Sequence, residues 1–184
     1  MGYTHYFKMP KPQKTGPWMA LVDDVGKLMG RLPTAGQLLG SYGIDTGPIT
    51  LCGPHGSGEP ICNANEIAFN GDASLDMASE TLLLLPKKID DYCKTARHPY
   101  DFVVCGVLAL ANHHLPRFDL RSDGDTEEWR PALDWLQKHI NPDVVMPTGI
   151  RPTAVSPAMS ARPTAAFRNW QLPLDGPGIA DAYF

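Results

Sequence analysis

The stretch CKTARHPYD at positions 93–101 concentrates more chemically capable side chains than any other part of the chain. It holds the cations Lys94 and Arg97, the Thr95 hydroxyl and the Tyr100 phenol, and an apolar helix is expected to begin directly after it. A helix N-terminus favours an anion, and a guanidinium can hold a phosphate or carboxylate through two parallel hydrogen bonds. The segment therefore predicts a phosphate or carboxylate site. The alternative is that both cations only neutralise neighbouring aspartates on a solvated loop.

A second polar cluster follows the expected strand 66–69 and precedes the expected strand 81–85. Asn70 and Asp72 lie at the end of the first strand, and Glu80 lies at the start of the second. Side chains at strand ends can project together and offer carboxylates to ribose hydroxyls, a base edge, a metal or a catalytic water. An Asx turn with solvent-facing acids explains the same residues.

The N-terminal residues add an aromatic edge. Tyr3, His5 and Tyr6 could stack against a nucleobase or another ligand ring. Packing within a strand explains these three side chains equally well.

Metal-binding and nucleophile patterns are weak. Cys52, His55 and Cys62 are irregularly spaced, and a structural zinc site needs a fourth ligand from elsewhere, so whether they bind a metal is left open. Cys93 is the best candidate nucleophile, but no base stands at a recognisable spacing from it. We predict no metal and no cofactor, and the sequence does not decide whether the protein is an enzyme.

Hydrophobic periodicity gives the elements that must position these residues. The expected order is βαβββαβα in an α+β domain with one mixed sheet and about three helices. The strands are expected at 2–7, 66–69, 81–85 and 117–122, with an irregular hairpin inside 34–66. The helices are expected at 17–32, 102–114 and 126–140, the last of them capped by Asp125 or Thr126.

Composition limits the class of protein. The chain has 184 residues, of which 43% are hydrophobic and 20% charged, and its formal net charge is −4. A negative net charge disfavours binding to duplex nucleic acid or to an anionic membrane surface. The longest apolar stretch, 102–111, is half the roughly 20 residues that cross a bilayer. With no signal peptide recognisable in MGYTHYFK, we expect a soluble cytoplasmic protein without a membrane partner.

The C-terminal part differs in composition from the rest. Residues 141–184 carry seven of the 18 prolines and no lysine, and RPTA occurs at 151–154 and again at 162–165. We therefore expect a domain over 1–140 and an extended arm over 141–184. Apolar residues between Phe167 and Phe184 would anchor the arm on its own body or on a neighbour, which suggests a homo-oligomer or another protein partner.

The segments MGYTHYF, FNGD, YCKTARHPYD and SDGD resemble, in this order, those of an uncharacterised family of small bacteriophage and prophage proteins. The resemblance spans about 1–140 and leaves the proline-rich arm outside the family pattern, in which a tryptophan is usual at the position of Tyr6. It implies that the shared polar residues line one pocket. A phage setting further implies a nucleotide-like ligand, such as a host signalling nucleotide that is sequestered or degraded.

The leading hypothesis is a pocket that binds a small anionic, nucleotide-like ligand. The expected ligand-binding residues are His5, Asn70, Asp72, Glu80, Lys94, Thr95, Arg97 and Tyr100. One alternative is a structural or assembly component that acts through its C-terminal arm. Another is a nucleotide hydrolase in which Asp72 or Glu80 serves as general base.

Overall fold

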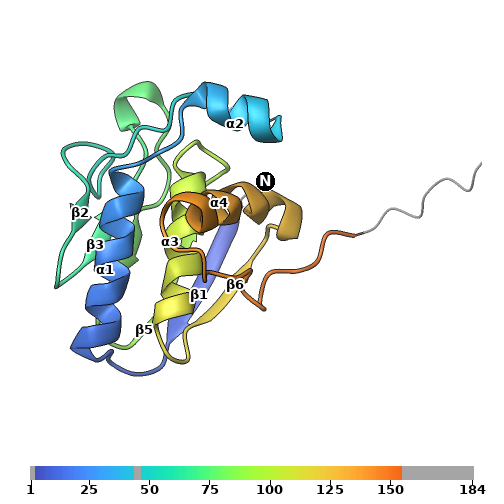
Figure 1. The fold of residues 1–184 in the computed structure, drawn as a ribbon. Coiled ribbons are helices and arrows are strands. Elements are labelled where there is room, and N and C mark those ends of the chain that lie inside the picture. The colour runs from blue at the N-terminus through green and yellow to red at the C-terminus, as the bar shows by residue number, and fades with distance from the viewer. Residues whose placement is uncertain (1–2, 44–46, 155–184) are drawn as a thin grey trace, which may run out of the picture. The chain divides into compact units, whose positions relative to one another are not determined.

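The computed structural model describes residues 3–43 and 47–154, which form an α+β domain (Figure 1). The expected α+β class is confirmed. In place of one mixed sheet, the described residues form two separate three-stranded sheets, both antiparallel.

The first sheet has the order β5-β1-β6. Its strands are β1 (Thr4–Met9), β5 (Ile89–Lys94) and β6 (Asp119–Ser122). The N-terminal strand is central, pairing His5 with Cys93 on one side and with Ser122 on the other. The smaller sheet has the order β2-β3-β4, and its strands are β2 (Ile61–Cys62), β3 (Ile67–Phe69) and β4 (Leu82–Leu84).

Four α-helices lie in the described part of the chain. They are α1 (Thr15–Met29), α2 (Ala35–Tyr42), α3 (Asp101–His114) and α4 (Thr126–His139), and a short 3-10 turn, η1 (Ala73–Leu75), follows β3. The expected buried helix is α3, in which every residue from Val103 to Ala111 is buried. It packs between α1 and α4, with the inner face of β1 behind it (Figure 1).

Local chemistry explains the helix ends. Asp125 caps α4, as expected, by accepting from the backbone N–H groups of Glu127 and Glu128. The helix α2 lies in a stretch expected to be turns and an irregular hairpin. A capping box between Thr34 and Gln37 starts it, and Gly43, with φ of 68°, ends it in the left-handed conformation that glycine tolerates.

The compact unit continues to Thr153 instead of ending at residue 140. Val144 and Ile150 are buried, and Arg151 forms a bridge with Asp125 at the start of α4. Gly149 lies so close to the Leu120 carbonyl that a side chain would have no room there. The first part of the expected arm therefore belongs to the domain core, whereas the expected anchors from Phe167 to Phe184 lie outside the described residues.

None of the helices in the described ranges is both long enough and apolar enough to cross a membrane. The α3 helix is the most apolar of them, and its buried residues are covered by α1, α4 and the first sheet.

Candidate functional site

A cavity of about 290 Å³ opens where the start of α3 faces α4. Apolar side chains form most of its wall, and they come from α2, α3, α4 and the loop before α3. The lining residues are Tyr3, Leu38, Arg97, His98, Pro99, Asp101, Phe102, Cys105, Glu128, Pro131 and Ala132. An apolar hollow with a few converging polar groups is the usual form of a small-molecule site.

Asp101 is the polar centre of this cavity. Its Oδ1 accepts a hydrogen bond of 2.8 Å from His5 Nε2 and one of 2.5 Å from the Thr95 hydroxyl. Its Oδ2 receives a longer contact of 3.8 Å from the Cys105 thiol. The Asp101 side chain is 19% exposed, whereas the His5 side chain is fully buried. The carboxylate is thus fixed from behind and can accept from the cavity side.

Ser122 determines which nitrogen of His5 carries the proton. Its Oγ lies 3.2 Å from the indole Nε1 of Trp129 and 2.9 Å from the backbone N of Gly124, and both of these groups can only donate. They occupy the two lone pairs of the hydroxyl, so its own hydrogen points at His5 Nδ1, 3.0 Å away. Nδ1 is therefore the acceptor, and the neutral imidazole donates from Nε2 to Asp101.

Arg97 is the cation at the cavity rim. Its Nη2 lies 2.8 Å from Glu128 Oε1, and its guanidinium carbon lies 4.1 Å from the centre of the Tyr3 ring, a cation–π contact. The hydrogen bond to Glu128 raises the pKa of Arg97. Ala96 and Arg97 both have positive φ, 53° and 61°. This tight left-handed turn reverses the chain after β5 and directs Arg97 back over Tyr3.

The cysteine thiols are not activated. Burial and the nearby Asp101 raise the pKa of Cys105 well above its ordinary value. Burial likewise raises the pKa of Cys93, the candidate nucleophile, whose thiol points at the Glu80 carbonyl. Neither thiol is a thiolate nucleophile at neutral pH.

Of the eight expected site residues, Arg97 lines this cavity. His5 and Thr95 do not line it, but both donate hydrogen bonds to Asp101, which does. Tyr100 stands immediately before α3 and is buried, and its hydroxyl donates to the Glu80 backbone carbonyl at 2.8 Å. The carboxylate of Glu80 accepts from the backbone N of Lys94 at 2.7 Å. These contacts hold β5 and the start of α3 against the chain before β4, and they do not bring Glu80 into the wall of this cavity.

The remaining expected residues also make structural contacts. Asn70 is buried, and its amide donates to the backbone carbonyl of Ser79 and accepts from the backbone N–H of the same residue. Asp72 is part-exposed and caps η1 by accepting from Ser74. Lys94 is exposed on the first sheet and pairs in register with Thr4. The structure therefore does not place Asn70, Asp72 or Lys94 among the residues that line this cavity.

Sequence reasoning missed four participants. Asp101, Cys105, Ser122 and Glu128 are absent from the expected ligand-binding residues, although Asp101 ends the stretch CKTARHPYD. The spacing of Asp101 and Cys105 was an available signal, because residues four apart share one face of a helix.

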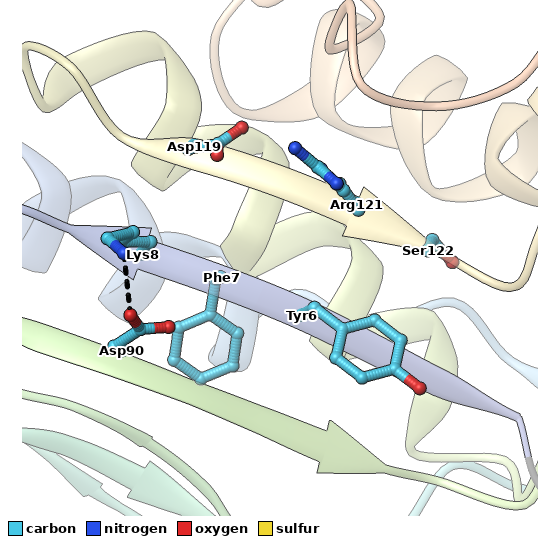
Figure 2. A pocket seen from close by; sticks show the side chains of 7 residues that line it. All are labelled: Tyr6, Phe7, Lys8, Asp90, Asp119, Arg121 and Ser122. Atoms are coloured by element: carbon cyan, nitrogen blue, oxygen red, sulfur yellow. Dashed lines mark ion pairs between the residues drawn. The ribbon is translucent and has the colours of Figure 1, made fainter.

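The open face of the first sheet carries a different depression of about 480 Å³, which is more open to solvent than the cavity. Figure 2 shows Tyr6, Lys8 and Arg121 standing on this face beside Asp90 and Asp119. Lys8 and Asp90 form an ion pair of 2.7 Å, although both side chains are at least half exposed. Such an exposed pair contributes little, so this face is a weaker candidate than the cavity.

One group of potential metal ligands converges among the residues that the structure describes. It consists of His5, Asp101 and Cys105, whose ligand atoms all lie within 4.8 Å of one another. Cys52, His55 and Cys62 are not part of any such group within the described ranges.

Comparison with known proteins gave no match to a protein-family model, a curated protein or a solved structure. The interpretation of the site therefore depends on its own geometry.

Proposed function

We propose that this domain binds a small nucleotide-like ligand in the cavity at the start of α3. The observation that carries the proposal is the placement of one cation, Arg97, and the carboxylates of Asp101 and Glu128 around a hollow whose wall is otherwise mainly apolar. A nucleotide has the matching features: an anionic phosphate, hydrogen-bond donors and a flat apolar ring.

The walls suit a planar ring. Leu38, Phe102, Pro131 and Ala132 supply apolar surface from three helices. The volume of about 290 Å³ lies just below the range of roughly 300–1,000 Å³ that small-molecule sites occupy. A single nucleobase with its sugar is therefore a better fit than a dinucleotide.

The polar groups of the cavity further restrict which ligand can bind. A bare phosphate would approach Arg97 but would also meet the carboxylates of Asp101 and Glu128, which repel it. A ligand that presents amino or hydroxyl donors to the two carboxylates offsets this repulsion while its phosphate binds Arg97. Each charge-assisted hydrogen bond of this kind contributes roughly 1.5–3 kcal/mol.

The proposal is for binding and not for turnover. Asp72 and Glu80, the general bases expected for a hydrolase, bind backbone groups away from this cavity. Together with the resemblance to phage proteins, the cavity supports a role in sequestering a host signalling nucleotide. The alternative role in assembly depends on residues 155–184, which lie outside the described part, and no contact described above favours it.

Calorimetric titration of the full chain with a panel of nucleosides, nucleotides and inorganic phosphate tests the proposal. We expect at least one nucleotide to bind and inorganic phosphate not to bind. Arg97→Ala removes one charge-assisted contact and should weaken that binding about 10- to 100-fold. Arg121→Ala, on the open face of the first sheet, is the matched control and should bind like wild type.

The opposite pattern would contradict the assignment. If Arg97→Ala binds the nucleotide as tightly as wild type, or if Arg121→Ala weakens it equally, the ligand does not occupy this cavity. Circular dichroism of both variants shows whether either substitution has altered the fold.

A further inference from the structure

We propose that His5, Asp101 and Cys105 form a binding site for a zinc-like divalent metal ion, with an open coordination position facing the cavity. The inference is independent of the nucleotide proposal, because it depends on these three side chains alone. It departs from the sequence-based expectation of no metal, which did not bring Asp101 and Cys105 together with His5.

The donor set selects the kind of metal. An imidazole nitrogen, a carboxylate oxygen and a thiolate sulfur are the three ligand types that zinc takes in proteins. Magnesium and calcium prefer oxygen ligands only, so a thiol and an imidazole make them poor occupants. Three protein ligands with a fourth position open are typical of reactive zinc sites, whereas structural sites use four.

The distances fit a single ion. His5 Nε2 lies 2.8 Å from Asp101 Oδ1 and 4.0 Å from Cys105 Sγ, and that sulfur lies 3.8 Å from Asp101 Oδ2. Zinc bonds of about 2.0–2.3 Å place tetrahedral ligand atoms roughly 3.3–3.7 Å apart. The imidazole and the thiol approach different oxygens of Asp101, and with one ligand atom from each residue the three atoms lie within 4.8 Å of one another. Side-chain shifts of up to about one ångström would bring all three atoms into bonding range.

The ligands are held on rigid elements. His5 points inward from β1, the central strand of the first sheet, and Asp101 and Cys105 share one face of the first turns of α3. The Ser122 hydroxyl lies 3.0 Å from the second ring nitrogen of His5, and Thr95 donates to Asp101. Metal-binding histidines and carboxylates are characteristically oriented by partners of this kind.

Metal binding has a balanced proton count. Without metal, the Nε2–H of His5 and the thiol of Cys105 both point at Asp101. When the metal binds Nε2, the imidazole proton moves from Nε2 to Nδ1. The Nδ1–H group then donates a hydrogen bond to the Ser122 hydroxyl, where it replaces the longer hydrogen bond from Trp129. The thiol proton passes to solvent as the sulfur–metal bond forms. The net charge of the cluster changes from −1 to zero, which removes an uncompensated carboxylate charge from a mostly buried place.

The fourth position faces the ligand cavity, because Asp101 and Cys105 both contribute to its wall while His5 lies behind them. A water molecule or a donor atom of a ligand can occupy it. A ligand in the cavity could therefore bind the metal ion directly.

Titration of the full chain with Co²⁺ and Zn²⁺, without nucleotide, tests the site. We expect one ion per chain, a thiolate-to-cobalt charge-transfer absorption in the near ultraviolet, and displacement of Co²⁺ by Zn²⁺. Cys105→Ala should abolish this absorption and weaken zinc binding at least 10-fold, whereas Cys62→Ala, which removes a half-buried thiol elsewhere, should leave both unchanged.

Two results would overturn the proposal. The first is the absence of a charge-transfer absorption from wild-type protein at saturating Co²⁺, which needs no variant and so does not depend on whether Cys105→Ala folds. The second is unchanged metal binding in folded Cys105→Ala. Nucleotide binding that persists in metal-free protein would leave the proposed function standing even if the metal site failed.

Discussion

Ser122 shows how a single side chain prepares the site. It receives two N–H groups that can only donate and passes its own hydrogen to His5, so three partners depend on one hydroxyl. His5 then donates to Asp101, which faces the cavity. A small residue at the end of β6 thereby determines the orientation of a carboxylate on α3.

Ser122→Ala should reduce the free energy of unfolding by about 1–3 kcal/mol, because it leaves buried polar groups of His5 and Trp129 without a partner. Urea denaturation followed by circular dichroism measures the loss. Ser57→Ala, at an exposed loop position, is the control and should stay within about 0.5 kcal/mol of wild type. A Ser122→Ala variant as stable as the control would show that the hydroxyl does not carry this network.

The sequence indicated which single residues could bind a ligand better than it indicated which of them lie together in the structure. Of the residues expected in the site, Arg97 lines the cavity, and His5 and Thr95 lie behind it, hydrogen-bonded to Asp101. They come close together because Thr95 and Arg97 belong to one short loop and His5 to the adjacent strand. Asp72 and Glu80 were also expected, but local backbone groups compete for their carboxylates. Such competition is common for acids in turns and depends on backbone geometry that the sequence alone does not show.

The buried carboxylate of Asp24 connects three elements of the domain: α1, α3 and the chain after α4. Asp24 of α1 binds His114 at the end of α3 at 2.9 Å, Asn141 at 2.9 Å and Lys27 at 2.8 Å. Burial opposes its ionisation, but the hydrogen bonds from these three partners hold the pKa of Asp24 below its ordinary value. The carboxylate therefore joins three segments of the core.

Asp24→Asn should destabilise the fold by at least about 1.5 kcal/mol near neutral pH, because the charge-assisted bonds are lost. A lowered native pKa gives stability that is complete above the unfolded pKa of about 3.9 and is lost as the pH falls through the native value. The difference in unfolding free energy between wild type and variant should therefore shrink in acid.

Urea denaturation at a series of pH values measures this difference. The matched control is Asp23→Asn, at the exposed neighbouring position of α1, which should cost little at any pH. A constant difference between wild type and Asp24→Asn across the acid range would contradict the linkage.

The helices with clear periodicity were predicted well, whereas β5 and α2 were not. The β5 sequence, IDDYCK, has three consecutive polar or half-polar residues, Asp90, Asp91 and Tyr92, and its pairing with β1 decides its conformation. The α2 segment contains two glycines, which lower helix propensity, and its capping box compensates for them. Tertiary pairing and capping are the features that periodicity does not report.

For the whole molecule, the arrangement of the compact unit explains why the cavity lies where it does. The central strand β1 runs behind α3, and the loop between β5 and α3 turns over its end, so residues from both meet at the first turn of that helix (Figure 1). The α+β class follows from the order of elements. The division into two sheets does not, because short strands carry little information about their partners.

The central claim is that a nucleotide-like ligand occupies the cavity beside Arg97 and Asp101. An NMR titration of the isotope-labelled full chain with the tightest-binding nucleotide of the panel tests it most directly, because every backbone amide reports separately. We predict that the largest shifts lie in 97–105 and 128–132 and that the amides of Tyr6 and Arg121 on the open sheet face stay unchanged. Shifts centred on that sheet face, with 97–105 unaffected, would contradict the claim.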